Sequence, residues 1–138
     1  MSNLIQNAVF DRSGVPLLKK FLDLSSVRHK LISGNIANVS TPGYRGKDID
    51  FHGELQKVAY RKGGIKGALT HPNHLPTGQS AESGPDIIVD KSRETNGINN
   101  VNIDREMANL AENQIYFSVG AKLLANQFQA LRKAITSK

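Results

Sequence analysis

The sequence predicts a mainly α protein in which N- and C-terminal helices form a coiled-coil-like pair, joined by a loop-rich middle with short β pieces. Two observations predict this. Apolar residues at both ends recur at helical spacing, and nine of the twelve glycines lie between Gly43 and Gly97. Only 38% of the 138 residues are hydrophobic and 6% are aromatic. Since soluble domains are on average more apolar, we expect a thin core.

The C-terminal segment 101–138 carries the strongest periodic pattern. Ten of its positions follow a 4–3 spacing and nine of the ten are apolar, which is typical of a coiled-coil seam. These positions are Ile103, Met107, Leu110, Gln114, Phe117, Ala121, Leu124, Phe128, Leu131 and Ile135. Asn102 is suited to cap the start of this helix. A helix over 102–136 would be about 50 Å long.

An N-terminal helix is predicted within 16–43, from about Pro16, which suits a first helical position, to about Val39. The dipeptide Pro42-Gly43 ends it, because proline disfavours helical geometry in the residue before it. At about 35 Å this helix leaves about a third of the longer one without a partner. We expect residues 1–15, a flexible segment that orders on assembly, or other subunits to cover the remainder.

The middle segment, 44–100, contains two strand-like pieces. Residues Lys47 to Phe51 alternate between polar and apolar, and the run Ile87 to Val89 is apolar and bounded by turn residues. The stretch between them is predicted to be loop, a small β excursion, or a segment that orders only on assembly.

Three polar residues interrupt the apolar stripes of the two helices: Arg28, Asn35 and Gln114. One interpretation is that these edges of the helices are exposed. The other is that the polar groups are buried and fix register and partner choice, as polar residues do in coiled coils. The sequence leaves both interpretations open.

Histidines are the strongest candidates for metal ligands. His71 and His74, together with His52, could form a cluster, but Pro72 interrupts the pair and the chain has no cysteine. An interrupted pair in a loop is a weak metal signal. We therefore expect loop histidines, no metal and no cofactor.

Neither the acidic residues nor the glycines indicate catalysis. Asp48 and Asp50 alternate with Ile49 and Phe51, so they are expected on the solvated face of a strand. The stretch 63–67 lacks the spacing of a phosphate-binding loop, and no nucleophile motif is present. The sequence predicts no catalytic residue and a protein that is not an enzyme.

The net charge of +6 raises nucleic acid as a partner. The basic residues are scattered, however, and no aromatic residues are interleaved with them to stack on bases. A basic nucleic-acid-binding helical protein is therefore the minor alternative. The chain has no apolar run long enough to insert into a membrane, and Met1 to Phe10 does not resemble a cleaved signal peptide.

A short segment of the chain carries a family resemblance. Asn35-Ile36-Ala37-Asn38, followed by Thr41-Pro42-Gly43-Tyr44, resembles the N-terminal signature of the flagellar axial proteins, which include rod, hook and hook-associated proteins. Asn99 to Met107, Asn113-Gln114 and Phe128 to Arg132 are similar to the C-terminal segment of one small proximal rod protein in this family. Around these motifs the resemblance extends over roughly residues 15–51 and 97–135, about half of the chain.

The resemblance implies a structural subunit of the proximal rod of the bacterial flagellar basal body, part of the axle that transmits torque. Its partners would be other rod proteins, the rod–membrane-ring junction and the flagellar type III export apparatus, which exports such proteins without a cleaved signal peptide. It would lie in the periplasm-spanning rod and serve motility by self-assembly. A second small proximal rod protein of the same family is the alternative.

The expected interface residues come from the signature and from the C-terminal seam. They are Asn35, Ala37, Asn38, Thr41, Pro42, Gly43, Tyr44, Ile103, Met107, Leu110, Gln114, Phe117, Leu124, Phe128 and Leu131. The amides of Asn35 and Asn38 could either cap the end of their own helix or bond to a neighbouring subunit. We expect the bond to a neighbour, because the resemblance implies that the shared terminal helices are the parts that assemble.

Overall fold

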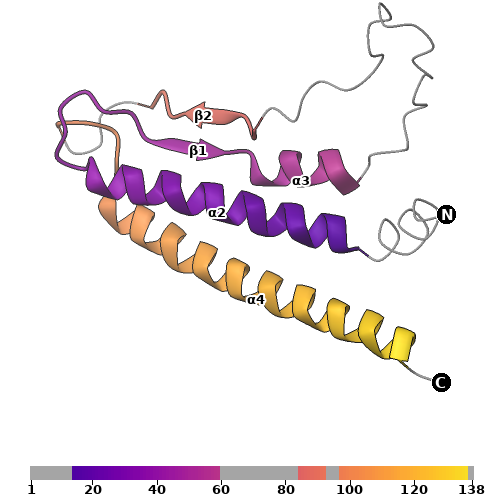
Figure 1. Cartoon of the computed structure of the whole chain (residues 1–138). Helices are drawn as coiled ribbons and strands as arrows, with labels where there is room; N and C mark the ends of the chain where they lie inside the picture. Colours follow the sequence, from indigo (N-terminus) through magenta and orange to yellow (C-terminus); the bar gives the residue numbers. More distant parts are fainter. Residues whose placement is uncertain (1–13, 60–83, 93–96, 137–138) are drawn as a thin grey trace, which may run out of the picture.

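The computed structural model describes residues 14–59, 84–92 and 97–136, and within them the chain is mainly helical, as predicted (Figure 1). The elements are helix α2 (Val15–Ala37), strand β1 (Lys47–Ile49), helix α3 (Phe51–Ala59), strand β2 (Ile87–Val89) and helix α4 (Ile103–Thr136). None of these helices is long and apolar enough to cross a membrane.

Helices α2 and α4 lie side by side and run in opposite directions (Figure 1). The start of α2 faces the middle of α4, where the ring of Phe21 lies against Gly120. The end of α2 faces the start of α4, where Asn35 bonds to Glu106. With 34 residues against 23, α4 is longer than α2 by about 16 Å. The predicted helix pair and its mismatch in length are confirmed.

Local signals set the ends of both helices. Pro16 lies in the first turn of α2, where a missing N–H costs nothing. The helix ends at Ala37, two residues before the predicted end. The N–H of Asn38 is shared between the carbonyl oxygens of Gly34 and Asn35, and the N–H of Val39 then donates to the carbonyl oxygen of Ile36, three residues back, which tightens the last turn. The predicted cap of α4 is confirmed, since Asn102 Oδ1 accepts a hydrogen bond from the N–H of Arg105 at 3.0 Å.

The two strand-like pieces form one antiparallel pair, in which Lys47 lies opposite Val89 and Ile49 opposite Ile87. The predicted strand was expected to reach Phe51, and this is wrong, because Asp50 starts a helix there. Its Oδ1 accepts a hydrogen bond from the N–H of Gly53 at 2.9 Å. Helix α3 was therefore not predicted from the sequence.

The core is small and partly polar. Within residues 14–59, 84–92 and 97–136 the buried apolar side chains are Leu24, Ile32, Ile49 and Val101. The buried polar residues are Ser25, Asn35, Glu54, Asn99, Asn100 and Asn113. Helix α3 is held against the helix pair by an aromatic cluster, in which the ring of Phe21 lies 5.2 Å from that of Phe51 and 6.3 Å from that of Tyr116. Buried asparagines thus replace part of the apolar core near the signature segment.

Candidate functional site

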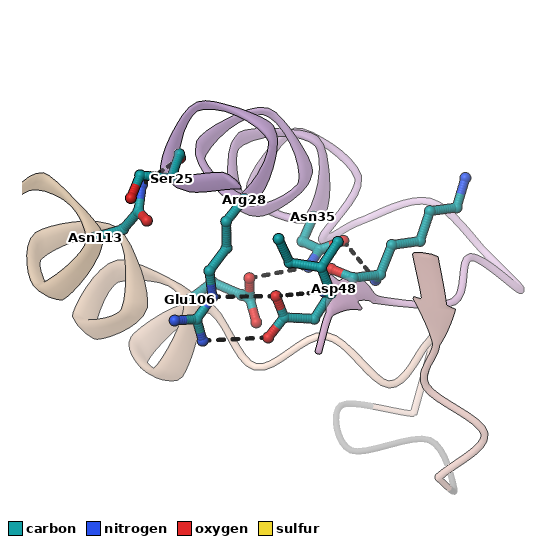
Figure 2. A network of polar contacts seen from close by, with 8 residues as sticks. Ser25, Arg28, Asn35, Asp48, Glu106 and Asn113 are labelled. Carbon is teal, nitrogen blue, oxygen red and sulfur yellow. Dashed lines mark hydrogen bonds and ion pairs between the residues drawn. The ribbon is translucent and has the colours of Figure 1, made fainter. Parts of the chain in front are cut away.

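Asn35, the first asparagine of the signature, is 3% exposed and joins three elements (Figure 2). Its Nδ2 donates to the carbonyl oxygen of Lys47 at 2.9 Å and to Glu106 Oε2 at 3.0 Å. Its Oδ1 accepts from the N–H of Lys47 at 2.9 Å and from the hydroxyl of Tyr44 at 3.2 Å. Both N–H groups and the oxygen of this amide therefore have partners in the same chain.

Tyr44 covers this network from the turn that follows α2. Burial raises the pKa of its hydroxyl, and the negative charge of Glu106 raises it further. The hydroxyl therefore stays protonated and remains a donor to Asn35. The ammonium group of Lys47 lies 5.9 Å from the centre of the Tyr44 ring, within the range of a cation–π contact.

Asn38, the second asparagine of the signature, acts at the end of its own helix. Its Nδ2 donates to the carbonyl oxygen of Gly34 at 2.8 Å, and the same oxygen also accepts from the backbone N–H of Asn38 at 3.2 Å. Its Oδ1 accepts a hydrogen bond from the hydroxyl of Thr41 at 3.1 Å. We therefore revise the expectation for Asn35 and Asn38, because the structure uses both amides within the subunit. Their proposed bonds to a neighbour are not needed to explain the signature.

Asn99 holds the signature turn from the other side. Its Nδ2 lies 2.9–3.0 Å from the carbonyl oxygens of Asn38, Val39 and Thr41, so one amide serves three carbonyls. Its Oδ1 accepts a hydrogen bond from the N–H of Val101 at 2.9 Å. The end of α2 and the start of α4 are thereby fixed to each other through a single buried side chain.

Asn100 joins the same region to the sheet. Its Oδ1 accepts from the N–H of Gly46 at 2.8 Å, and its Nδ2 donates to the carbonyl oxygen of Asp90 at 3.1 Å. We call Asn35, Asn38, Asn99 and Asn100 the asparagine junction. Asn99 and Asn100 were not among the predicted site residues. Their signal in the sequence was a run of asparagines directly before the cap of α4.

The three polar seam residues divide between the two interpretations. Arg28 forms two hydrogen bonds with the carboxylate of Asp48, at 3.1 and 3.2 Å, and joins α2 to β1 (Figure 2). Asn35 is buried, whereas Gln114 is exposed. The register interpretation thus describes Arg28 and Asn35, and the exposed interpretation describes Gln114. Asp48 was expected on a solvated face, but it serves as the partner of Arg28.

The face of α4 that contacts α2 differs from the predicted seam. Its buried residues are Asn113 and Gly120, one position before the predicted Gln114 and Ala121. Asn113 Nδ2 donates to the carbonyl oxygen of Ser25 at 2.9 Å (Figure 2). The predicted seam followed the largest number of apolar residues and agrees with the contact face only in part, because the contact also uses a hydrogen bond and a glycine.

A large part of the predicted seam is therefore exposed on one flank of α4. We call Ile103, Met107, Phe117, Phe128 and Ile135 the flank stripe, and all of them are at least 41% exposed. The predicted seam residues Leu110, Ala121, Leu124 and Leu131 are half-buried. At 100° per residue from the contact face at Gly120, Ile115, Val119 and Leu123 form a second exposed stripe on the opposite flank of α4.

The remaining predicted site residues lie at the turn after α2. Ala37, Thr41, Pro42 and Gly43 are exposed there. Gly43 has a φ of 69°, a conformation that glycine adopts without strain. Its N–H donates to the carbonyl oxygen of Ile98 at 3.2 Å, so the turn is also tied to the segment before α4.

The candidate metal ligands are not brought together in the described parts of the chain. Those ranges contain no group of three histidine or acidic residues that could hold a metal ion. His52 is exposed, and its Nε2 lies 2.7 Å from the side-chain nitrogen of Gln56. His71, His74 and the glycine stretch 63–67 lie outside the described residues.

Comparison with known proteins gives the chain a family. No family model matches it. The flagellar basal body rod protein FlgB of Salmonella typhimurium is 32% identical over 120 residues, which cover 83% of this chain and 86% of the relative. FlgB of Borrelia hermsii is 32% identical over 133 residues, which cover 92% and 98%. The chain belongs to the FlgB family of flagellar basal body rod proteins.

A third FlgB protein, from Bacillus subtilis, is 32% identical over 121 residues and covers 86% of this chain. The resemblance to a small rod protein is thus confirmed. Similarity to FlgB also extends well beyond the motifs that suggested it, because it includes the middle segment as well as both helices. The asparagine junction, which joins the middle segment to both helices, therefore lies within the part of the chain that is similar to FlgB.

Proposed function

We propose that the chain is a non-enzymatic structural subunit of the proximal rod of the flagellar basal body, and that it joins its neighbours through the exposed apolar stripes of α4. Two observations support this: membership of the FlgB family and the flank stripe. The asparagine junction fixes the helix pair within one subunit, and the stripes, which are exposed among the described residues, offer the contacts between subunits.

The exposed apolar surface of α4 is the observation that carries the proposal. Ile115 is 61% exposed and Ile135 is 83% exposed, although both are large apolar residues. A helix with apolar residues on more than one side is usually covered on those sides in its working state. Within the described residues, α2 covers one face of α4, and at least two further stripes remain for neighbouring subunits.

The partners that we propose are other rod proteins and the rod–membrane-ring junction. We also propose that the flagellar type III export apparatus delivers the subunit to the periplasm-spanning rod without cleavage of a signal peptide. The FlgB family supports these assignments. The contribution of this subunit would be mechanical, as one element of the axle.

The experiment compares single substitutions in a strain that lacks its own copy of the gene. Phe128→Asp places a carboxylate in the flank stripe, where burial by a neighbour would cost several kcal/mol, on the order of the penalty for an unpaired buried charge. We expect loss of swimming and of rods in purified basal bodies. Since Phe128 is 49% exposed in the subunit, its stability should change little.

Gln129→Asp is the matched control, because it places the same carboxylate on the next residue of α4, at an exposed polar position. This variant should swim normally. Leu124→Asp should differ from both, because Leu124 is half-buried beside α2 and its loss should also lower the stability of the subunit. Normal swimming of Phe128→Asp would contradict an interface at the flank stripe.

A further inference from the structure

The pattern of hydrogen bonds in the small sheet fixes which backbone groups point outward. The N–H of Asp90 donates to the carbonyl oxygen of Gly46 at 2.8 Å, so these two residues face each other through hydrogen-bonding groups. In an antiparallel pair this relation recurs at every second residue. Asp48 and Ile88, which lie opposite each other, therefore exchange the next bonds. The residues on either side of them direct their backbone groups away from the partner strand.

The outer edge of β1 is closed by side chains. The N–H and carbonyl groups of Lys47 are both bonded by Asn35, each at 2.9 Å. The N–H of Ile49 donates to Asp48 Oδ1 at 2.8 Å. A further strand would therefore have to displace the asparagine junction in order to pair with this edge.

The outer edge of β2 is open in the described part of the chain. Its outward backbone groups belong to Ile87 and Val89, and β2 lies on the side of β1 away from α2 (Figure 1). All three side chains of the strand are exposed, among them Ile88 at 53%. Proteins usually protect such edges with charges or proline within the strand, and β2 has neither.

We propose that the outer edge of β2 pairs with β2 of a second copy of this chain. The two outward residues, Ile87 and Val89, are placed symmetrically about Ile88. In an antiparallel pairing centred on Ile88, Ile87 of each copy faces Val89 of the other, and every outward N–H meets a carbonyl oxygen. The two Ile88 side chains then lie across from each other. Both are β-branched, and their contact shields them from water.

The same geometry sets the size and form of the association. A contact between identical edges about a two-fold axis is closed, so it gives a dimer and no filament. Asp86 and Asp90 at the strand ends would lie opposite each other across the pair, and like charges there limit its length. A contact of three residues per copy is small, so we expect a weak and reversible dimer of the free subunit, separate from the contacts of α4.

Amide exchange measured by NMR at two protein concentrations tests the proposal on the full chain. At high concentration, on the order of 1 mM, the amides of Ile87 and Val89 should exchange several-fold more slowly than in dilute solution. The amide of Ile88 points to β1, so its exchange should not depend on concentration. Slow exchange of Ile87 and Val89 in the dilute monomer would overturn the proposal, because another segment of the same chain would then cover the edge.

Val89→Pro removes one outward N–H and leaves the bonds between β1 and β2 intact. It should abolish the increase in average mass with concentration that sedimentation equilibrium detects for the parent chain. Val89→Thr is the matched control, because it keeps both the N–H and the branched side chain, and it should associate like the parent. If Val89→Pro associates normally and Phe128→Asp does not, self-association runs through α4 and the proposal is wrong.

Discussion

The side-chain amide of Asn35 bonds to both backbone groups of Lys47, accepting from its N–H and donating to its carbonyl oxygen, each at 2.9 Å. A side chain of α2 thus takes the place that a neighbouring strand would have beside β1. The second N–H of the same Nδ2 reaches Glu106 on α4. Two helices and the sheet therefore depend on one amide.

Asn35→Ala should lower the free energy of unfolding by about 2–3 kcal/mol, because several buried polar groups lose their partner at once and each costs about 1–3 kcal/mol when left unpaired. Urea unfolding followed by circular dichroism measures the change. Asn126→Ala, at an exposed position of α4, is the control and should cost nothing. A loss of less than about 0.5 kcal/mol for Asn35→Ala would show that the network is not structural.

Asn99 allows a test of charge at constant shape. Asn99→Asp replaces a donor by a carboxylate oxygen, which would lie against three carbonyl oxygens at 2.9–3.0 Å. We expect Asn99→Asp to destabilise the subunit more than Asn99→Ala, because repulsion is added to the lost hydrogen bonds. Thermal unfolding at neutral pH compares the two variants. The reverse order of stability would rule out a donor role for Asn99.

Gly120 permits the close approach of α2 and α4. A Cβ at this position would lie 2.8 Å from Cδ1 of Phe21, whose ring is held in the aromatic cluster. Gly120→Val should destabilise the subunit by about 1–3 kcal/mol, as overpacked contacts do. Phe21→Leu in the same chain should recover part of the loss. Ala125→Val, on the exposed side of α4, is the control, and an equal loss there would mean that the contact at Gly120 is not the cause.

Tyr44 makes the stability of the folded subunit depend on pH in the alkaline range. Its pKa is raised from 10.0 by burial and by Glu106, so the fold favours the neutral hydroxyl. The stability from this group is present below the pKa of the unfolded chain and is lost as the pH rises through the folded pKa. Tyr44→Phe should cost about 0.5–1.5 kcal/mol at pH 8, and this gap should shrink above about pH 10. A gap that stays constant to about pH 11 would contradict the assignment.

The sequence predicted those parts of the fold that have strong local signals. Pro16 marks the start of α2, Asn102 caps α4, and the β-branched run at Ile87 forms a strand. Helix α3 was missed because polar and apolar residues alternate up to Phe51, and this pattern hides the cap at Asp50. A nine-residue helix offers too few turns for its own periodicity to outweigh that pattern.

The candidate site was only partly predictable. The signature asparagines were found, but the partners of their side chains depend on which segments meet after folding, and Asn99 lies 61 residues from Asn38. The contact face of α4 could not be chosen from periodicity, because apolar residues occupy several sides of this helix. The role of the flank stripe between subunits stays a prediction.

The contact between Phe21 and Gly120 sets how far α2 runs beside α4. Helix α2 begins at Val15, six residues before Phe21, so in the antiparallel pair it reaches about residue 126 of α4. The rest of α4, to Thr136, continues past the start of α2 as an arm of about 15 Å by the helical rise. A bend of about 10° at the base of this arm would move its tip by about 3 Å, the rise of two residues. A neighbour that binds the tip therefore applies a bending force to α4 near its contact with α2.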